Sequence, residues 1–167
     1  MSKLTPEQEY LDLYHRMAKL CEEQGWGDPF SYARSKEIHA AAILGHKIAP
    51  TLSGADAIGP NGEEYEYKST IAPKVKGSYT GISVQSTWQA QVNYLRNEKI
   101  LKYPMHFFNR FEGGKLVESW SLTGHQVYQI LLPKLKKKFA TQSNKADPRL
   151  SANVTNTEIK KFGKRIL

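Results

Sequence analysis

Apolar residues recur at intervals of three and four near the start of the chain, a spacing typical of one face of a helix. Thr5 is a suitable N-cap, Pro6 fits the first helical position, and Gln8 completes a capping box. The apolar stripe that follows, up to a helix end at Gly25, consists of Tyr10, Leu13, Tyr14, Met17, Leu20 and Cys21. The stripe predicts a helix that packs either on the chain's own core or in a dimer contact.

A second helix is predicted from Asp28 to Leu44. Asp28-Pro29 is a helix start of the same kind, and Gly45 provides the end. The run from Ile38 to Leu44 is nearly all apolar, so we expect this helix to be buried on most of its sides.

Alternating residues predict strands in the middle of the chain. The strands are expected at residues 64–68, 80–85, 103–111 and 115–122, with a helix at 87–100 among them. Thr123 caps a further helix that Pro133 interrupts or ends. The polar residues 140–153 predict a loop, and Thr155-Asn156-Thr157-Glu158 is a capping box that opens a short last helix. This order of elements indicates an α/β or α+β fold, with a central mixed β-sheet flanked by helices.

Composition and charge limit the classes of protein that the chain can belong to. Its 167 residues fit one domain spanning 1–167, and no apolar run is long enough for a membrane span. The formal net charge of +8 favours an anionic partner, most often nucleic acid. Because Cys21 is the single cysteine, an intrachain disulfide and a cysteine-based zinc site are excluded, and a reducing compartment is expected.

The first of the predicted strands is unusually charged. Glu64, Glu66 and Lys68 alternate along it with two tyrosines, so the charged side chains share one face and the tyrosines the other. A Gly-Pro-Asn-Gly turn precedes the strand and would fold Asp56 back beside Glu66 and Lys68 in a hairpin. Two carboxylates and one ammonium group would then share a small volume.

These groups suit metal-dependent hydrolysis of a phosphodiester. Asp56, Glu66 and the backbone carbonyl of Tyr67 offer the oxygen donors that Mg²⁺ prefers, and the ion would activate a water beside the phosphate. Lys68 would stabilise negative charge in the transition state, and its further use as the general base is left open. The alternative is an ordinary solvated hairpin with a face of Glu and Lys side chains.

Several short pieces with matched spacing surround this hairpin and cover roughly a quarter of the chain. They are a helix ending Leu44-Gly45, then Pro50, Gly54-x-Asp56-Ala57, Gly62-x-Glu64-Tyr65-Glu66-x-Lys68-Ser69, Lys76-Gly77 and Thr80. Together they resemble the PD-(D/E)xK nucleases, and among these the type II restriction endonucleases, although Ala55 stands in place of the proline in the family's name. The resemblance implies a restriction-endonuclease-like core.

The resemblance also implies a role for each charged residue of the hairpin. Asp56 and Glu66 would be the metal ligands, and Lys68 would be the catalytic lysine. Glu64 would then hold Lys68 or a metal-bound water.

The same resemblance implies double-stranded DNA as the partner. The type II enzyme that this stretch resembles carries base-reading histidines after its Lys-Gly, whereas this chain has Thr80-Gly81-Ile82-Ser83, so a different target or different contacts are expected. The candidate DNA-binding residues are Lys76, Ser78, Thr80, Ser83, Gln85, Asn144, Arg149 and Asn153.

The expected function is Mg²⁺-dependent cleavage of a short palindromic DNA site by a homodimer. Residues 1–27 would form the dimerisation helix, 36–122 the catalytic core, and 140–167 a DNA-contacting loop and short helix. Such an enzyme would be encoded by a bacterium, an archaeon or a phage and act in the cytoplasm beside a protective methyltransferase. Two alternatives stay open: a structure-selective or repair nuclease of the same fold, and a basic DNA-binding protein without catalysis.

Overall fold

The computed structural model describes residues 4–50, 53–141 and 148–167. Its helices are α1 (Pro6–Glu23), α2 (Arg34–Leu44), α3 (Trp88–Tyr94), α4 (Gly124–Ala140) and α5 (Asn156–Phe162), with a π-helical turn at Leu95–Lys99 after α3. Its strands are β1 (Lys47–Ile48), β2 (Ala57–Ile58), β3 (Glu64–Thr70), β4 (Gly77–Ser83), β5 (Met105–Glu112), β6 (Lys115–Thr123), β7 (Arg149–Val154) and β8 (Lys164–Arg165). Among these helices, none is long and apolar enough to cross a membrane.

Within the described residues, six strands form one mixed sheet in the order β1-β2-β3-β5-β6-β8. The central strands β3 and β5 are parallel, and the other neighbours are antiparallel. Strands β4 and β7 form a separate antiparallel pair, called here the β4–β7 ribbon. The expected mixed α and β class with a central mixed sheet is therefore confirmed.

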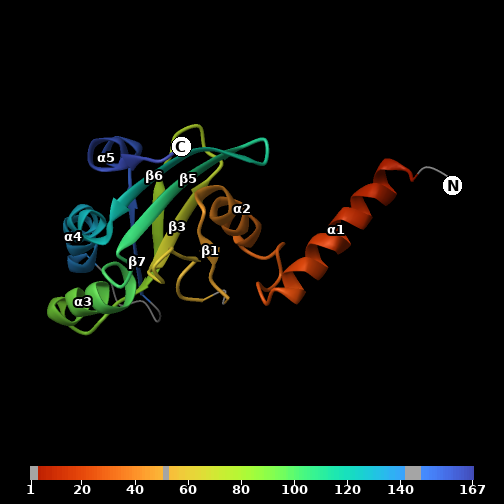
Figure 1. Ribbon diagram of the computed structural model, residues 1–167. Helices are drawn as coiled ribbons and strands as arrows, with labels where there is room; N and C mark the ends of the chain where they lie inside the picture. The colour runs from red at the N-terminus through yellow and green to blue at the C-terminus, as the bar shows by residue number, and fades with distance from the viewer. Residues whose placement is uncertain (1–3, 51–52, 142–147) are drawn as a thin grey trace.

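The sheet has a different apolar core on each face, and Figure 1 shows α2 on one side of β3 and β5 and α4 on the other. On one face, α2 places Ala40 and Ala41 against Tyr65, Tyr67 and Phe107. On the other face lies the larger core, in which α4 and the β4–β7 ribbon cover side chains of β5 and β6. The buried residues that β3 contributes, Tyr65 and Tyr67, belong to the core on the α2 side.

The predicted helix caps are confirmed at three helices. Thr5, Thr123 and Thr155 each form a capping box at the start of α1, α4 and α5. Pro133, however, lies inside α4, which runs on to Ala140, so the prediction that this proline interrupts or ends the helix is wrong.

The predicted helix start at Asp28 is also wrong, because Asp28 caps a turn instead. Its carboxylate accepts a hydrogen bond of 2.5 Å from the Ser31 hydroxyl. Helix α2 begins at Arg34, whose buried guanidinium donates to the backbone carbonyls of Trp26 and Ala49. This buried arginine fixes the segments on both sides of α2, which no local sequence pattern reveals.

Two expectations, the burial of α2 and the loop at residues 140–153, need correction. Helix α2 is not buried on most sides: Ala40 and Ala41 face the sheet, but Ile43 is 57% exposed. Residues 140–153 are not all loop, because Arg149–Val154 forms β7 and pairs with β4. Both differences arise from long-range packing, since α2 covers the sheet with one side only and β7 needs β4 as its partner.

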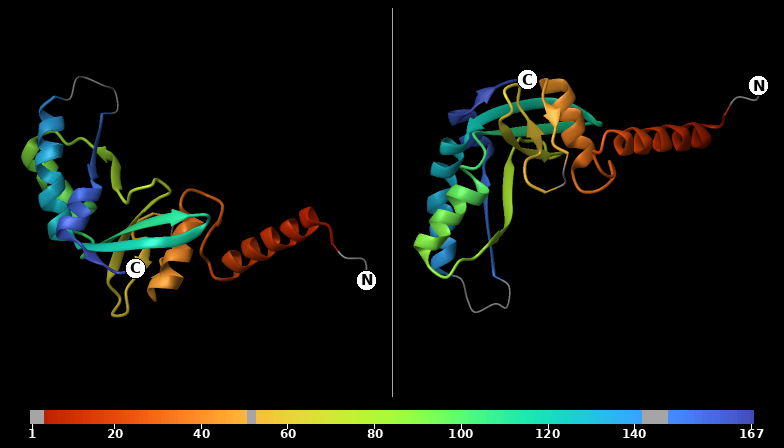
Figure 2. Two further views of the ribbon diagram at one scale, coloured as in Figure 1. Left: turned by 90° about the horizontal axis from the view of Figure 1, so that it is seen from above. Right: turned by 60° about the horizontal axis from the view of Figure 1, so that its bottom comes forward.

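Helix α1 extends away from the rest of the molecule (Figures 1 and 2). Its apolar stripe is largely uncovered, with Tyr10 70% and Leu13 52% exposed. The contacts of α1 with the body include Tyr14, near the middle of the helix, which stacks on Phe30 at 3.8 Å between ring centroids, and the buried Cys21 near its end. Packing of the whole stripe on the chain's own core, one of the two predicted arrangements, is therefore wrong.

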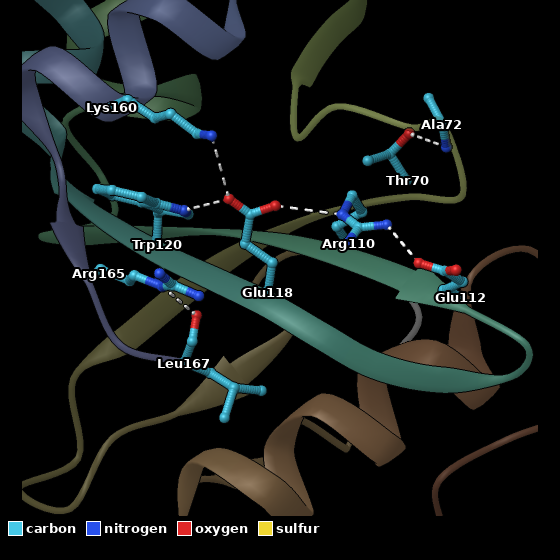
Figure 3. Close-up of polar contacts among 9 residues, drawn as sticks. All are labelled: Thr70, Ala72, Arg110, Glu112, Glu118, Trp120, Lys160, Arg165 and Leu167. Atoms are coloured by element: carbon cyan, nitrogen blue, oxygen red, sulfur yellow. Dashed lines mark hydrogen bonds and ion pairs between the residues drawn. The ribbon is translucent and has the colours of Figure 1, made fainter.

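A charged cluster fixes the β5–β6 hairpin to the C-terminal part of the chain (Figure 3). The Glu118 carboxylate accepts hydrogen bonds from Trp120 (2.8 Å) and Arg110 (3.1 Å) and lies 3.8 Å from the Lys160 ammonium of α5. Arg110 also pairs with Glu112 at 2.9 Å. Because Arg110 and Glu118 are partners across β5 and β6, the cluster favours the observed register of these strands.

Gly77 leaves room for the buried ring of Phe108, so we predict that an alanine there destabilises the fold. A Cβ atom at Gly77 would overlap the Phe108 ring. We expect Gly77→Ala to lower the free energy of unfolding by about 1–3 kcal/mol, measured by urea denaturation. Phe108→Leu should recover part of this loss in the double variant, because it vacates the same space. If the double variant loses as much unfolding free energy as the two single variants together, the prediction is contradicted.

Candidate active site

The hairpin predicted around Asp56 is present. Strands β2 and β3 pair antiparallel, with Ala57 opposite Tyr65, and the Asp56 N–H donates to the Tyr65 carbonyl at 3.0 Å. The turn is closed by a hydrogen bond of 2.8 Å from the Gly59 N–H to the Glu63 carbonyl. The turn thus returns the chain so that Asp56 lies beside β3.

The two faces of β3 separate tyrosines from charges, as predicted. Tyr65 and Tyr67 are buried beside Phe107, and the Tyr67 hydroxyl lies 2.6 Å from His46 Nδ1. Side chains alternate along a strand, so Glu66 and Lys68 emerge on the opposite face. Their side chains are only 15% and 23% exposed, so this charged pair sits in a recess of the surface.

Asp56, which directly precedes β2, completes the group. Its Oδ2 atom accepts a hydrogen bond of 2.7 Å from the Tyr67 N–H. Burial, and after it the charge of Glu66, raises the pKa of Asp56 from 3.8 to about 7. The Tyr67 N–H and the Lys68 ammonium act in the opposite direction but are outweighed. A cation shared by Asp56 and Glu66 would relieve this repulsion.

Lys68 is held by two neighbours. Its ammonium forms an ion pair with the Glu66 carboxylate. The same nitrogen lies 4.8 Å from the centroid of the Tyr79 ring. The side chain of Glu64 is exposed and forms no hydrogen bond or ion pair with the described residues, so Lys68 is held by Glu66 and Tyr79 in this structure.

The donors at this site fit Mg²⁺ better than a softer metal. The described part of the chain contains no group of three or more His, Cys, Asp and Glu side chains that could hold a metal ion. The set that remains is two carboxylates, from Asp56 and Glu66, with the Tyr67 carbonyl as a further oxygen donor. Mg²⁺ is commonly bound by one or two carboxylates and keeps several of its waters, so these donors are compatible with Mg²⁺.

The charged face of β3 opens into a pocket of about 400 Å³. Besides Glu66, Lys68 and the predicted Thr80, the pocket is lined by residues that the sequence did not identify: Gly54, Tyr79, Ile82, Tyr94, Glu98, Lys99, Ile100, Lys102 and Tyr103. Of these, only Tyr79 could have been found from the sequence, because it is an apolar residue between the polar residues Ser78 and Thr80 and so is expected on the inner face of β4. Gly54 precedes β2 and Ile82 lies on β4, whereas the remaining residues come from the end of α3 and from the segment between α3 and β5, which contains no recognisable motif.

Five of the eight predicted DNA-binding residues lie on the β4–β7 ribbon: Ser78, Thr80, Ser83, Arg149 and Asn153. Ser78 lies opposite Asn153, and Ser83 lies opposite Arg149. The Arg149 guanidinium donates to the Ser83 hydroxyl at 2.6 Å, which joins the two strands at one end.

Thr80 of the ribbon and the candidates outside the ribbon have different surroundings. Lys76 and Thr80 are exposed, and Thr80 reaches the site pocket. Gln85 is half-buried, and its N–H donates to the Gln91 side chain at 2.9 Å. Asn144 lies outside the described residues.

Comparisons with known proteins identify no relative of this chain among protein-family models or curated proteins. The arrangement of Asp56, Glu66 and Lys68 is therefore the observation from which a function has to be argued.

The raised pKa of Asp56 predicts a pH-dependent effect of Asp56→Asn on the metal-free protein. In the folded state the Asp56 carboxyl group keeps its proton up to about pH 7, whereas in the unfolded chain it loses the proton near pH 3.8. Stability of the wild-type protein should therefore fall as the pH rises through this interval, and a neutral asparagine avoids the loss. We expect the advantage of Asp56→Asn in unfolding free energy to grow by about 2 kcal/mol between about pH 5 and about pH 8.

Urea denaturation with a chelator present measures this difference. Glu64→Gln is the matched control, because it removes a carboxylate from an exposed position of the same hairpin. An advantage of Asp56→Asn that is equal at both pH values, or that shrinks at high pH, would contradict the assigned cause.

Proposed function

We propose that this protein is a Mg²⁺-dependent endonuclease that hydrolyses phosphodiester bonds of double-stranded DNA at a short palindromic site, as type II restriction endonucleases do. The observation that carries the proposal is the proximity of Asp56, directly before β2, to Glu66 and Lys68 of β3. This grouping agrees with the resemblance to PD-(D/E)xK nucleases. The fold class, an α and β domain with a mixed sheet, is compatible with it.

In this proposal each residue of the site has a defined task. Asp56 and Glu66 would hold Mg²⁺, together with the Tyr67 carbonyl. Mg²⁺, when bound, polarises the scissile phosphate and lowers the pKa of the attacking water. Lys68 would place its ammonium beside the phosphate and stabilise the charge that develops there, which is an electrostatic role.

The charge and shape of the surroundings support DNA as the substrate. The chain carries a net charge of +8, and Lys99 and Lys102 line the pocket beside the carboxylates. A two-stranded ribbon is one of the elements that the major groove of DNA admits. The β4–β7 ribbon carries exposed polar side chains, among them Ser78, Thr80 and Asn153, and would supply base contacts.

The proposal includes a homodimer, because a palindromic site has two scissile bonds related by symmetry. The exposed apolar stripe of α1 supports it. Leu13, Met17 and Leu20 are each about half exposed, at 52%, 46% and 48%. An amphipathic helix normally buries such a face, so a second copy of the chain would cover it.

We predict that Lys68→Ala abolishes cleavage while largely sparing DNA binding. Removing one electrostatic group at a developing charge slows the reaction by about 10²–10³-fold or more, whereas it removes only one of many positive charges from the binding surface. Incubation of plasmid DNA of varied sequence, with and without Mg²⁺, measures cleavage. A gel-shift assay with a chelator measures binding, and Lys74→Ala, at an exposed position after the same strand, is the control.

The same assays separate the alternatives. Discrete fragments from linear duplex DNA support a site-specific enzyme, whereas cleavage confined to branched DNA would support a structure-selective or repair nuclease. If wild-type protein binds DNA but shows no Mg²⁺-dependent cleavage, the protein is a DNA-binding module and the nuclease proposal fails.

A second prediction concerns the homodimer. Leu13→Lys and Met17→Lys place charges in the apolar stripe of α1, so we expect each to weaken self-association by at least about tenfold. Analytical ultracentrifugation over a range of concentrations measures the dissociation constant. His15→Lys adds a charge on the other side of the same helix and should leave the dimer intact. A monomeric wild-type protein, or equal effects of all three changes, would contradict the proposed interface.

A further inference from the structure

A buried hydrogen-bonded chain lies directly behind the candidate catalytic lysine. The Tyr79 hydroxyl of β4 is 2.9 Å from His106 Nδ1 of β5, and His106 Nε2 is 3.0 Å from the Ile100 carbonyl. All three residues are buried, and His106 lies opposite Glu66 in the parallel pairing of β3 and β5. The chain therefore joins three segments beneath the charged face of β3.

The direction of these hydrogen bonds follows from the chemistry of the groups. A carbonyl oxygen only accepts, so the Ile100 carbonyl requires the proton of His106 on Nε2. Nδ1 of a neutral imidazole is then an acceptor, and the Tyr79 hydroxyl must donate to it. Burial lowers the pKa of His106 to about 4, which agrees with a neutral ring. The hydrogen bond from the Tyr79 hydroxyl to His106 Nδ1 thus fixes the orientation of the Tyr79 ring.

The face of this fixed ring meets Lys68. The Lys68 ammonium lies 4.8 Å from the ring centroid, within the range in which a cation is attracted to an aromatic face. Lys68 is therefore held from two directions, by the Glu66 carboxylate and by the Tyr79 ring. If Glu66 is shared with a metal ion, its hold on Lys68 weakens, and the ring is the neighbour that still fixes the ammonium.

We propose that Tyr79 is a positioning residue for Lys68, and that His106 serves it by locking the ring in place. The inference rests on the proposed nuclease function for its catalytic meaning, although the geometry of the Tyr79, His106 and Lys68 side chains can be tested without it. Tyr79 contributes to the rate by restricting where the Lys68 ammonium lies, and it does not itself touch the phosphate in this scheme.

A kinetic experiment separates positioning from binding. Tyr79→Leu removes the ring, and we expect its single-turnover cleavage rate with saturating DNA to fall by about 10–100-fold while the DNA dissociation constant changes little. Tyr79→Phe keeps the ring but loses the bond to His106, so its loss should be clearly smaller. Tyr128→Leu removes a half-buried tyrosine ring of α4 outside the pocket and should cleave at nearly the wild-type rate.

An NMR experiment tests the same inference without cleavage. The side-chain methylene protons next to the Lys68 ammonium should be shifted upfield by the Tyr79 ring in the metal-free protein. This shift should persist in Tyr79→Phe and disappear in Tyr79→Leu. If Tyr79→Leu does not fold, the wild-type protein and Tyr79→Phe still decide the question. Absence of the upfield shift in the wild-type protein would overturn the inference.

The two experiments together distinguish the possible failures. Cleavage by Tyr79→Leu at the wild-type rate, in a protein whose wild type cuts DNA, would overturn the positioning role and leave the nuclease function standing. No cleavage by the wild-type protein, with the NMR shift present, would overturn the nuclease function and leave the Tyr79–Lys68 contact as a structural feature.

Discussion

The burial of Tyr65 and Tyr67 on one face of β3 is the constraint on which the candidate site depends. Because side chains alternate along a strand, this burial forces Glu66 and Lys68 to the opposite face. A slip of one residue would exchange the two pairs and place charges against Phe107, so the register is strongly determined. The site is thus a consequence of the packing of β3 between its two neighbours.

The same packing creates the electrostatic character of the site. Strand β2 brings Asp56 to β3, where the Tyr67 N–H fixes its carboxylate at 2.7 Å. Both carboxylates then lie in a recess that water solvates poorly, and the pKa of Asp56 rises to about 7. The fold holds the two carboxyl groups where ionisation of both is unfavourable without a nearby cation, and this is the physical basis for the expected preference for a cation.

Local patterns in the sequence predicted the hairpin, the two faces of β3 and the capping boxes, because neighbouring residues determine each of these features. The start of α2 at Arg34 and the strand β7 were not predictable in this way. Arg34 is fixed by carbonyls outside its own helix, and β7 forms only because β4 lies beside it. The hydrogen bond between Tyr79 and His106 joins residues 27 positions apart, so local sequence patterns did not predict it either.

Helix α1 supplies an argument about assembly that is independent of the site. An isolated helix of 18 residues has marginal stability in water, and tertiary contacts normally stabilise it by covering its apolar face. Here the body covers the stripe only in part, at Tyr14 and Cys21, while Tyr10, Leu13 and Met17 remain exposed. A helix of this composition gains most of its stability by packing its stripe against another apolar surface. A second α1 offers the same stripe, so self-association would stabilise the helix and bring two copies of the Asp56–Glu66–Lys68 group into one assembly.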